Sequence, residues 1–189
     1  LAALATLEAD TVFVPEMEEI YGGSDISTEV IVPELDSIYC GEYRPGHFKG
    51  VATIVTKLFN IIQPDVALFG TKDYQQLLVI RSLVDNLNLP IEIIGVPTVR
   101  EASGLAMSSR NKYLTETERM QASELHRCLE QAATAIKNGN IDYTELEKEA
   151  ITALKKAGFK PEYFSICDAK TLKSPENQEL VILAAAWLG

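Results

Sequence analysis

The sequence has few of the residues that build disulfide frameworks and metal sites. Its three cysteines, Cys40, Cys128 and Cys167, are far apart and odd in number. Its two histidines, His47 and His126, have no metal-ligand neighbour at a useful spacing. We therefore expect neither a disulfide scaffold nor a protein-built metal site. Free thiols are typical of a reducing compartment, so we expect a cytoplasmic protein.

Long hydrophobic runs are also missing. No apolar stretch approaches the roughly 20 residues that a helix needs to span a bilayer, and no signal-peptide pattern opens the chain. We therefore expect no association with a membrane. The 189 residues are 47% hydrophobic and 23% charged, which is typical of one globular domain or two small ones.

Positive charge is absent from the first part of the chain. Residues 1–43 hold ten acidic residues and no lysine or arginine, whereas residues 44–112 hold eight basic and five acidic residues. Residues 113–189 carry nine basic and twelve acidic residues. The net charge of −10 argues against nucleic-acid binding. Only the middle segment has a net charge suited to an anion.

Helix and strand patterns alternate in the middle of the chain. Apolar residues recur at helical spacing over 51–62, where Pro64 ends the helix, and a second helix is predicted over 73–87. Apolar strands follow over 65–70 and 91–96. This alternation predicts a parallel sheet with helices on both faces.

The acidic N-terminal part gives less regular signals. Residues 1–9 have the composition of the end of an apolar helix, from which we expect the chain to be a piece without its N-terminal part. TVFVP, residues 11–15, is predicted as a short buried strand, and a further strand is predicted near TEVIVPEL, residues 28–35.

The pattern changes after Pro97. Thr115 and Glu118 form a capping box that predicts a long helix to about residue 137, and Asp142 caps another that ends near residue 158.

Two strands are then predicted over 162–168 and 179–187, with a turn around 174–177. We therefore predict an α/β fold with a parallel-sheet domain over residues 1–97 and a smaller α+β domain over residues 98–189.

Residues 70–73 follow the first predicted strand and have the chemistry of a phosphate site. A helix N-terminus presents free N–H groups and partial positive charge. Gly70 permits close approach of a ligand, and Lys72 adds a full charge. Asp73 either caps the helix or accepts hydrogen bonds from sugar hydroxyls. The plainer interpretation, a turn and a capped helix with an exposed lysine, stays open.

A second polar loop, residues 107–110, follows the second predicted strand. The carboxyl ends of parallel strands open on one edge of a sheet, so Lys72 and Arg110 are expected to converge on one polyanion. Ser108 and Ser109 add hydroxyl groups, and an arginine can bind phosphate through two hydrogen bonds. The alternative is a polar linker between domains.

Four further polar positions are more ambiguous. Arg44 has the charge to pair with a carboxylate, and His47, near a helix start, is more often structural than catalytic. Gln75 and Gln76 are either solvated or orient a polar substrate beside the phosphate loop. We assign Asn111 a structural role.

Four motifs stand in order along the chain: RPGHF (44–48), FGTKDYQQL (69–77), VPTVRE (96–101) and GLAMSSRN (104–111). Together they closely resemble the pantoate–β-alanine ligase family, and the resemblance runs from LEADTVFVP to ELVILAAAWLG. It implies a Rossmann-like nucleotidyltransferase domain, a smaller C-terminal domain and a homodimer. It also implies that pantoate attacks the α-phosphorus of ATP with Mg²⁺, and that β-alanine then displaces AMP from the pantoyl adenylate.

The resemblance also implies roles for individual residues. Lys72 would contact the phosphates and Asp73 the ribose, while Gln76 would bind pantoate. The ATP-binding residues by resemblance are Gly70, Thr71, Lys72, Asp73, Val99, Met107, Ser108, Ser109 and Arg110, with a backbone contact to adenine at Val99.

Residues 107–110 resemble the KMSKS loop of class I aminoacyl-tRNA synthetases. Lys72, Ser108 and Arg110 are the expected catalytic residues. Arg44 and His47 are candidates on the side of the second substrate.

The sequence departs from the family pattern at several points. Thr71 stands where the family usually has glutamate. The HxGH motif, the first pantoate glutamine and a final TRLIDN-like strand are expected in segments that this chain lacks, and neither His47 nor His126 replaces the HxGH histidine. Two alternatives remain: another Rossmann-like nucleotidyltransferase, such as a cytidylyltransferase, or a non-catalytic fragment that retains folding and dimerisation surfaces.

Overall fold

The computed structural model describes residues 2–23, 28–175 and 179–189. The helices are α1 (Ala2–Thr6), α2 (Met17–Tyr21), α3 (Pro33–Asp36), α4 (Cys40–Tyr43), α5 (His47–Ile62), α6 (Tyr74–Asn86), α7 (Glu116–Ala122), α8 (Glu124–Lys137) and α9 (Tyr143–Lys156). The strands are β1 (Val66–Gly70), β2 (Glu92–Val96), β3 (Lys160–Asp168) and β4 (Leu180–Trp187), and two short 3-10 helices are η1 (Thr71–Asp73) and η2 (Ser109–Tyr113). Part of the turn predicted around 174–177 lies outside the described residues.

The first part of the fold, which we call the parallel-sheet unit, consists of α3–α6, β1 and β2. β1 and β2 pair in parallel, in register from Val66 opposite Glu92 to Gly70 opposite Val96, as predicted. α6 connects the two strands and packs close to β2 at Gly95. A Cβ atom there would lie 3.1 Å from the Leu77 side chain, so glycine allows this approach.

The prediction that helices cover both sheet faces is wrong for the described residues. Along each strand exposed and half-buried residues alternate, and Leu68 remains 65% exposed. Both helices lie on the same face, because the Phe59 ring of α5 packs against Phe69 at 6.4 Å and Leu77 of α6 lies over Gly95. An apolar strand sequence does not report which face a helix covers.

The two strands predicted in the N-terminal part are also absent from the described residues. Residues 11–15 are extended but largely exposed, and they pair with no other strand. In residues 28–35, Pro33 begins α3, since its fixed φ suits the first turn of a helix. The backbone before Pro33 is hydrogen-bonded to a helix and not to a sheet, because Val30 N–H donates to Thr53 Oγ1 of α5 at 2.9 Å.

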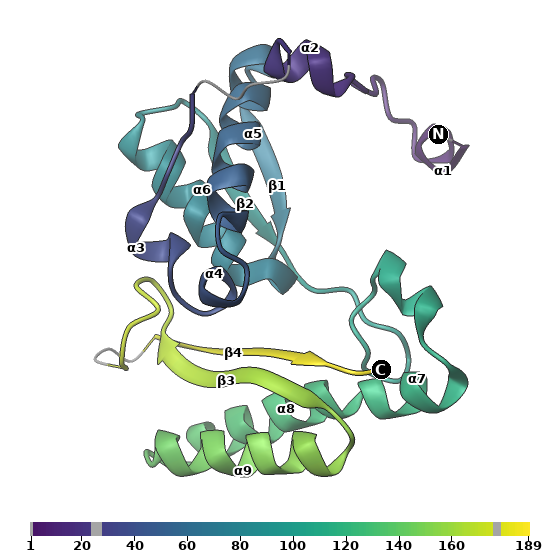
Figure 1. The fold of residues 1–189 in the computed structure, drawn as a ribbon, viewed down its shortest axis with the longest axis vertical. Helices are drawn as coiled ribbons and strands as arrows, with labels where there is room; N and C mark the ends of the chain where they lie inside the picture. Colours follow the sequence, from purple (N-terminus) through teal and green to yellow (C-terminus); the bar gives the residue numbers. More distant parts are fainter. Residues whose placement is uncertain (1, 24–27, 176–178) are drawn as a thin grey trace.

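The second part, which we call the hairpin unit, consists of α7–α9, β3 and β4. β3 and β4 form an antiparallel sheet, and α8 and α9 cover one of its faces (Figure 1). The long helix predicted from the Thr115 cap to residue 137 is two helices. They are separated at Ser123, whose hydroxyl donates to the Met120 carbonyl at 2.9 Å and so competes with the helical hydrogen bonds.

The other face of the hairpin contacts the parallel-sheet unit through tyrosine hydroxyls. Tyr39 Oη donates to the Leu172 carbonyl, Tyr43 Oη to the Glu162 carbonyl and Tyr74 Oη to the Ala169 carbonyl.

Apolar residues join the two units as well. Cys167, Leu172 and Leu183 belong to the same hydrophobic cluster as Phe48 and Leu83. A domain boundary at Pro97 remains a prediction. In the part of the chain that is described, no helix is long and apolar enough to cross a membrane.

The predicted capping box is present at the start of α7. Glu118 N–H donates to Thr115 Oγ1 at 3.3 Å, and Thr115 N–H donates to Glu118 Oε2 at 2.8 Å. We expect Thr115→Ala to lower the free energy of unfolding by about 1 kcal/mol, measured by urea denaturation. Thr117→Ala, in the same helix and equally exposed, is the control and should leave the midpoint nearly unchanged. Equal midpoints for both variants would show that the cap does not contribute.

Candidate active site

The carboxyl ends of β1 and β2 lie level at one edge of the sheet. Gly70, the last residue of β1, is paired with Val96, the last residue of β2. The two candidate phosphate loops therefore leave the sheet from the same edge, as predicted from the strand order. Apart from its chain neighbours, no described residue has an atom within 4 Å of the position that a Cβ on Gly70 would take, so the space beside Gly70 is open.

Lys72 and Asp73 are exposed at the start of α6. Lys72 Nζ lies 3.4 Å from Asp73 Oδ1, a surface pair that contributes little stability. Asp73 occupies the N-cap position, but its side chain makes no capping hydrogen bond. The first N–H groups of α6 therefore lack a side-chain acceptor from the cap, and the Asp73 carboxylate remains available to a ligand. This geometry favours the ligand interpretation of Asp73 over the capping one.

The structure separates Gln75 from Gln76, the glutamine that the family resemblance assigns to pantoate. Gln75 is only 4% exposed, and its Nε2 donates to the carbonyls of Leu35 and Ile38 at 2.8 Å each. Its Oε1 accepts from Cys40 N–H at 3.1 Å. Gln75 thus joins α6 to the segment that carries α3 and α4. Gln76, half-buried on the next position, has no such partner among the described residues and is free to contact a substrate.

The aperiodic stretch after β2 is a short hairpin. Met107 N–H donates to the Val99 carbonyl at 2.9 Å, and Glu101 N–H donates to the Leu105 carbonyl at 2.8 Å. Gly104 turns the chain with a φ of 91°, and a Cβ there would lie 2.9 Å from the His126 ring. The Val99 carbonyl accepts the one bond from Met107 N–H, and a backbone contact of Val99 to adenine remains a prediction.

Residues 107–110 project from the end of this hairpin. Ser108 Oγ accepts from Arg110 N–H at 3.2 Å and thereby starts η2. Met107, Ser109 and Arg110 are exposed, and within the described ranges the Arg110 side chain makes no hydrogen bond or ion pair. Figure 1 shows the chain leaving the sheet edge after β2 and running toward α7. Among the described residues no hydrogen bond or ion pair joins Lys72 to Arg110, so their convergence on one ligand remains a prediction.

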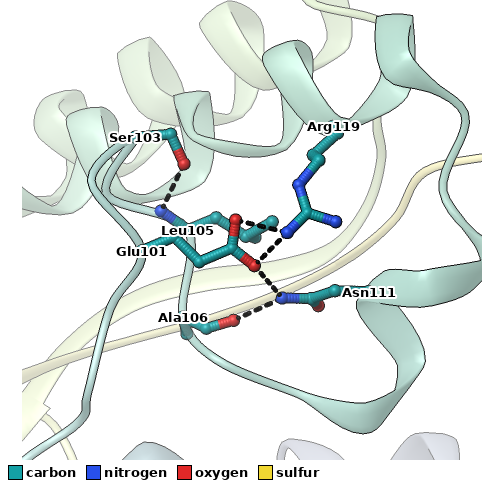
Figure 2. Close-up of polar contacts among 6 residues, drawn as sticks. All are labelled: Glu101, Ser103, Leu105, Ala106, Asn111 and Arg119. Atoms are coloured by element: carbon teal, nitrogen blue, oxygen red, sulfur yellow. Dashed lines mark hydrogen bonds and ion pairs between the residues drawn. The ribbon is translucent and has the colours of Figure 1, made fainter.

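Glu101 is the centre of a polar cluster that the sequence reading missed (Figure 2). It accepts hydrogen bonds from Asn111 and from Arg119 of α7. The bond from Asn111, followed by those from Arg119, holds the pKa of the Glu101 carboxyl below its usual value. Asn111, expected to be structural, is 9% exposed and buried in this cluster. The sequence contains one indication of this cluster, because Glu101 and Asn111 both lie in the four family motifs.

Arg44 and His47 lie at the junction of α4 and α5. Arg44 N–H donates to the carbonyl of Cys40, the residue whose N–H group is bonded to Gln75. His47 begins α5, and its exposed ring lies 5.0 Å from the Phe48 ring. Both residues are exposed. Their roles on the side of the second substrate remain predictions.

The cysteines are free, as expected. Burial raises the pKa of the Cys167 thiol to about 11 and also raises the pKa of Cys128, so both stay protonated at neutral pH and are poor nucleophiles. No group of three or more His, Cys, Asp or Glu residues suited to a metal is found in ranges 2–23, 28–175 and 179–189.

Comparisons with known sequences indicate the same family along the whole chain. The profile of the pantoate-beta-alanine ligase family matches residues 1–189. The pantothenate synthetase of Shewanella sp. (strain ANA-3) is 54% identical over 190 residues, covering 99% of this chain and 67% of that protein. The pantothenate synthetase of Azotobacter vinelandii (strain DJ / ATCC BAA-1303) is 53% identical, covering 94% and 64%. The chain thus spans about two thirds of the length of these relatives.

Solved structures agree. The pantothenate synthetase of Thermus thermophilus has a TM-score of 0.91 and 39% identity, covering 99% of this chain and 68% of that one. The pantoate-beta-alanine ligase of Francisella tularensis, solved in complex with β-γ ATP and β-alanine, has a TM-score of 0.75 and 31% identity, covering 99% and 67%. The predicted Rossmann-like α/β fold is confirmed. With the four motifs in order and both comparisons in agreement, this chain belongs to the pantoate–β-alanine ligase family.

Proposed function

We propose that the sheet edge carrying residues 70–73 and 107–110 binds ATP. The observation that supports this most strongly is the pairing of Gly70 with Val96, which starts both loops at one edge. The reaction follows from the family: ATP-dependent ligation of pantoate with β-alanine through a pantoyl adenylate, with release of AMP and pyrophosphate. The comparisons do not favour a cytidylyltransferase or a non-catalytic role.

In the first step a carboxylate oxygen of pantoate attacks the α-phosphorus of ATP, and pyrophosphate leaves. Such in-line displacement depends on positioning and charge neutralisation. We assign Lys72 and Arg110 to the phosphates, with hydroxyl groups of Ser108 and Ser109 beside them. The N-terminus of α6, which has no side-chain cap from Asp73, adds partial positive charge at the same edge.

Asp73 is assigned to the ribose hydroxyls and the Val99 backbone to adenine. Gln76, three positions along α6, is assigned to pantoate. Because Gln76 and Lys72 are one helical turn apart, the attacking carboxylate and the phosphates would lie side by side.

In the second step the amine of β-alanine attacks the acyl carbon of the adenylate. AMP leaves, and the amine loses a proton. An acyl adenylate hydrolyses readily, so closure of the exposed residues 107–110 over the site would exclude water. Arg44 and His47, at the junction of α4 and α5, are assigned to the β-alanine side.

Mg²⁺ is proposed as the partner of ATP. Magnesium is commonly held by substrate phosphates and only one or two carboxylates. The described residues contain no cluster of metal ligands, and Asp73 lies at the phosphate edge, which fits this kind of binding. The ion would neutralise phosphate charge. A homodimer and a cytoplasmic location remain proposals from the family resemblance.

Pantoate-dependent exchange of labelled pyrophosphate into ATP tests the adenylation step. We expect exchange only when pantoate is present, and stoichiometric AMP and pantothenate once β-alanine is added. A nucleotide-linked product without free AMP would identify a cytidylyltransferase-like reaction. Absence of ATP binding in calorimetry would contradict the proposed site.

A further inference from the structure

Glu101 lies where the hairpin after β2 meets the loop that carries Arg110 (Figure 2). Its Oε1 accepts a hydrogen bond from Asn111 Nδ2 at 2.9 Å, and both carboxylate oxygens lie 2.7 Å from Arg119 Nη2. Asn111 Nδ2 also donates to the Ala106 carbonyl at 3.0 Å. One carboxylate therefore joins the hairpin, η2 and α7.

Residues 107–110 are fixed at both ends, and the Glu101 cluster fixes the end at Asn111. At one end Met107 N–H is bonded to the Val99 carbonyl. At the other end the Asn111 side chain is buried and bonded to both Glu101 and the hairpin backbone. A short loop with two fixed ends has few backbone conformations to lose when it binds a ligand. Its exposed side chains are presented from a restrained backbone.

Glu101 also determines which cation is free. Arg119 is paired with Glu101, and Arg100 Nη1 donates to the Gly104 carbonyl at 3.0 Å. Among the described residues between 99 and 119, Arg110 is the arginine whose side chain has neither a hydrogen bond nor an ion pair. Without Glu101, the Arg119 guanidinium would be a second unpaired cation near the loop.

We propose that Glu101 is a positioning residue for adenylation, which holds the loop so that Arg110 meets the triphosphate while Glu101 itself does not touch ATP. The proposal rests on the phosphate role assigned to Arg110 above. An unrestrained loop would have to be ordered along its whole length at each turnover, whereas a loop held at Asn111 by the Glu101 cluster closes from an anchored end. Loss of the cluster should therefore affect the rate of adenylation more than the stability of the fold.

The test is Glu101→Gln, which keeps the shape and puts an amide group against Arg119. We expect kcat for pantoate-dependent ATP–pyrophosphate exchange to fall roughly 10-fold, less than the 100-fold that a 1 Å misplacement can cause, with KM for pantoate unchanged. Glu124→Gln is the matched control, because Glu124 forms the same kind of pair with Arg127 on the surface of α8. Its kcat should equal that of the unmodified protein, and urea midpoints are measured for both variants.

A double variant with Arg110→Ala tests whether Glu101 affects the exchange rate through Arg110. If Glu101 acts through Arg110, adding Glu101→Gln to Arg110→Ala slows exchange no further. Arg119→Gln, which breaks the same pair from the other side, should give the same loss as Glu101→Gln. The proposal would be overturned if the double variant lost the product of the two single-variant losses in exchange rate. It would also be overturned if Glu101→Gln exchanged as fast as Glu124→Gln. Normal exchange by Arg110→Ala alone would instead contradict the proposed ATP site, so the two failures are distinguishable.

Discussion

Replacement of Lys72 with alanine is expected to slow pantoate-dependent ATP–pyrophosphate exchange by roughly 100-fold or more, as for the loss of one transition-state donor. Lys72 lies at the start of α6 on the edge where both loops leave the sheet, and its amino group has only the surface pair with Asp73. Its charge is therefore available to the pyrophosphate leaving group. The substitution should leave the unfolding midpoint nearly unchanged, because the pair it removes is exposed.

The matched control is Lys148→Ala. Lys148 forms a surface pair with Glu145 at 3.6 Å, comparable to the 3.4 Å pair of Lys72, but it lies on α9 in the hairpin unit. Its exchange rate should equal that of the unmodified protein. Near-normal exchange by Lys72→Ala would remove Lys72 from the catalytic set and favour the interpretation of residues 70–73 as a turn with an exposed lysine.

The second large effect concerns stability. Gln75→Met keeps the volume of the side chain but removes all three hydrogen bonds to the α3–α4 segment. The Leu35 carbonyl and the Cys40 N–H group then lose their partner, whereas the Ile38 carbonyl still accepts from Gly41 N–H at 2.9 Å. We expect the free energy of unfolding to fall by about 3 kcal/mol, since each unsatisfied buried group costs roughly 1–3 kcal/mol and water reaches some of them. Urea denaturation followed by circular dichroism measures the change.

The adjacent glutamine provides the control. Gln76→Met makes the same chemical change one position along α6, where the side chain has no partner among the described residues. It should alter stability by no more than about 0.5 kcal/mol, but raise KM for pantoate. Equal urea midpoints for the two variants would show that the Gln75 bonds do not hold the segment. An unchanged KM would remove Gln76 from the pantoate site.

Regular periodicity predicted most of the fold. The helices of the middle segment, β1, β2 and the final hairpin follow from apolar spacing and turn residues, and the level strand ends follow from parallel pairing. The predictions of secondary structure are wrong where other contacts override the local sequence pattern. Val30 and its neighbours have strand composition, but Pro33 and the bond to Thr53 place them against a helix. The capping residue Thr115 predicts where α7 begins but not where it ends, and Ser123 interrupts the helix.

The candidate site was predictable to the level of its loops. Lys72 and Arg110 were predicted at one edge because strand order determines where loops leave a sheet. The pairing of Glu101 with Arg119 was not predictable, since it depends on the hairpin at Gly104 and on the direction of α7. The resemblance assigned Gln76 to pantoate, but the bonds of buried Gln75 to the α3–α4 segment were not predictable, since they depend on which side of α6 faces α4.

The tyrosine contacts between the two units have an evolutionary consequence. Tyr39, Tyr43 and Tyr74 each donate one hydrogen bond across the interface, and the rings of Tyr39 and Tyr43 also pack against Tyr163 of β3. Burial raises the pKa of Tyr39 and Tyr74, so these donors stay protonated under any physiological condition. One tyrosine-to-phenylalanine exchange deletes one crossing bond and retains the ring. Selection can therefore adjust the mobility of one unit against the other in small, separable steps, while the sequence of either core stays as it is.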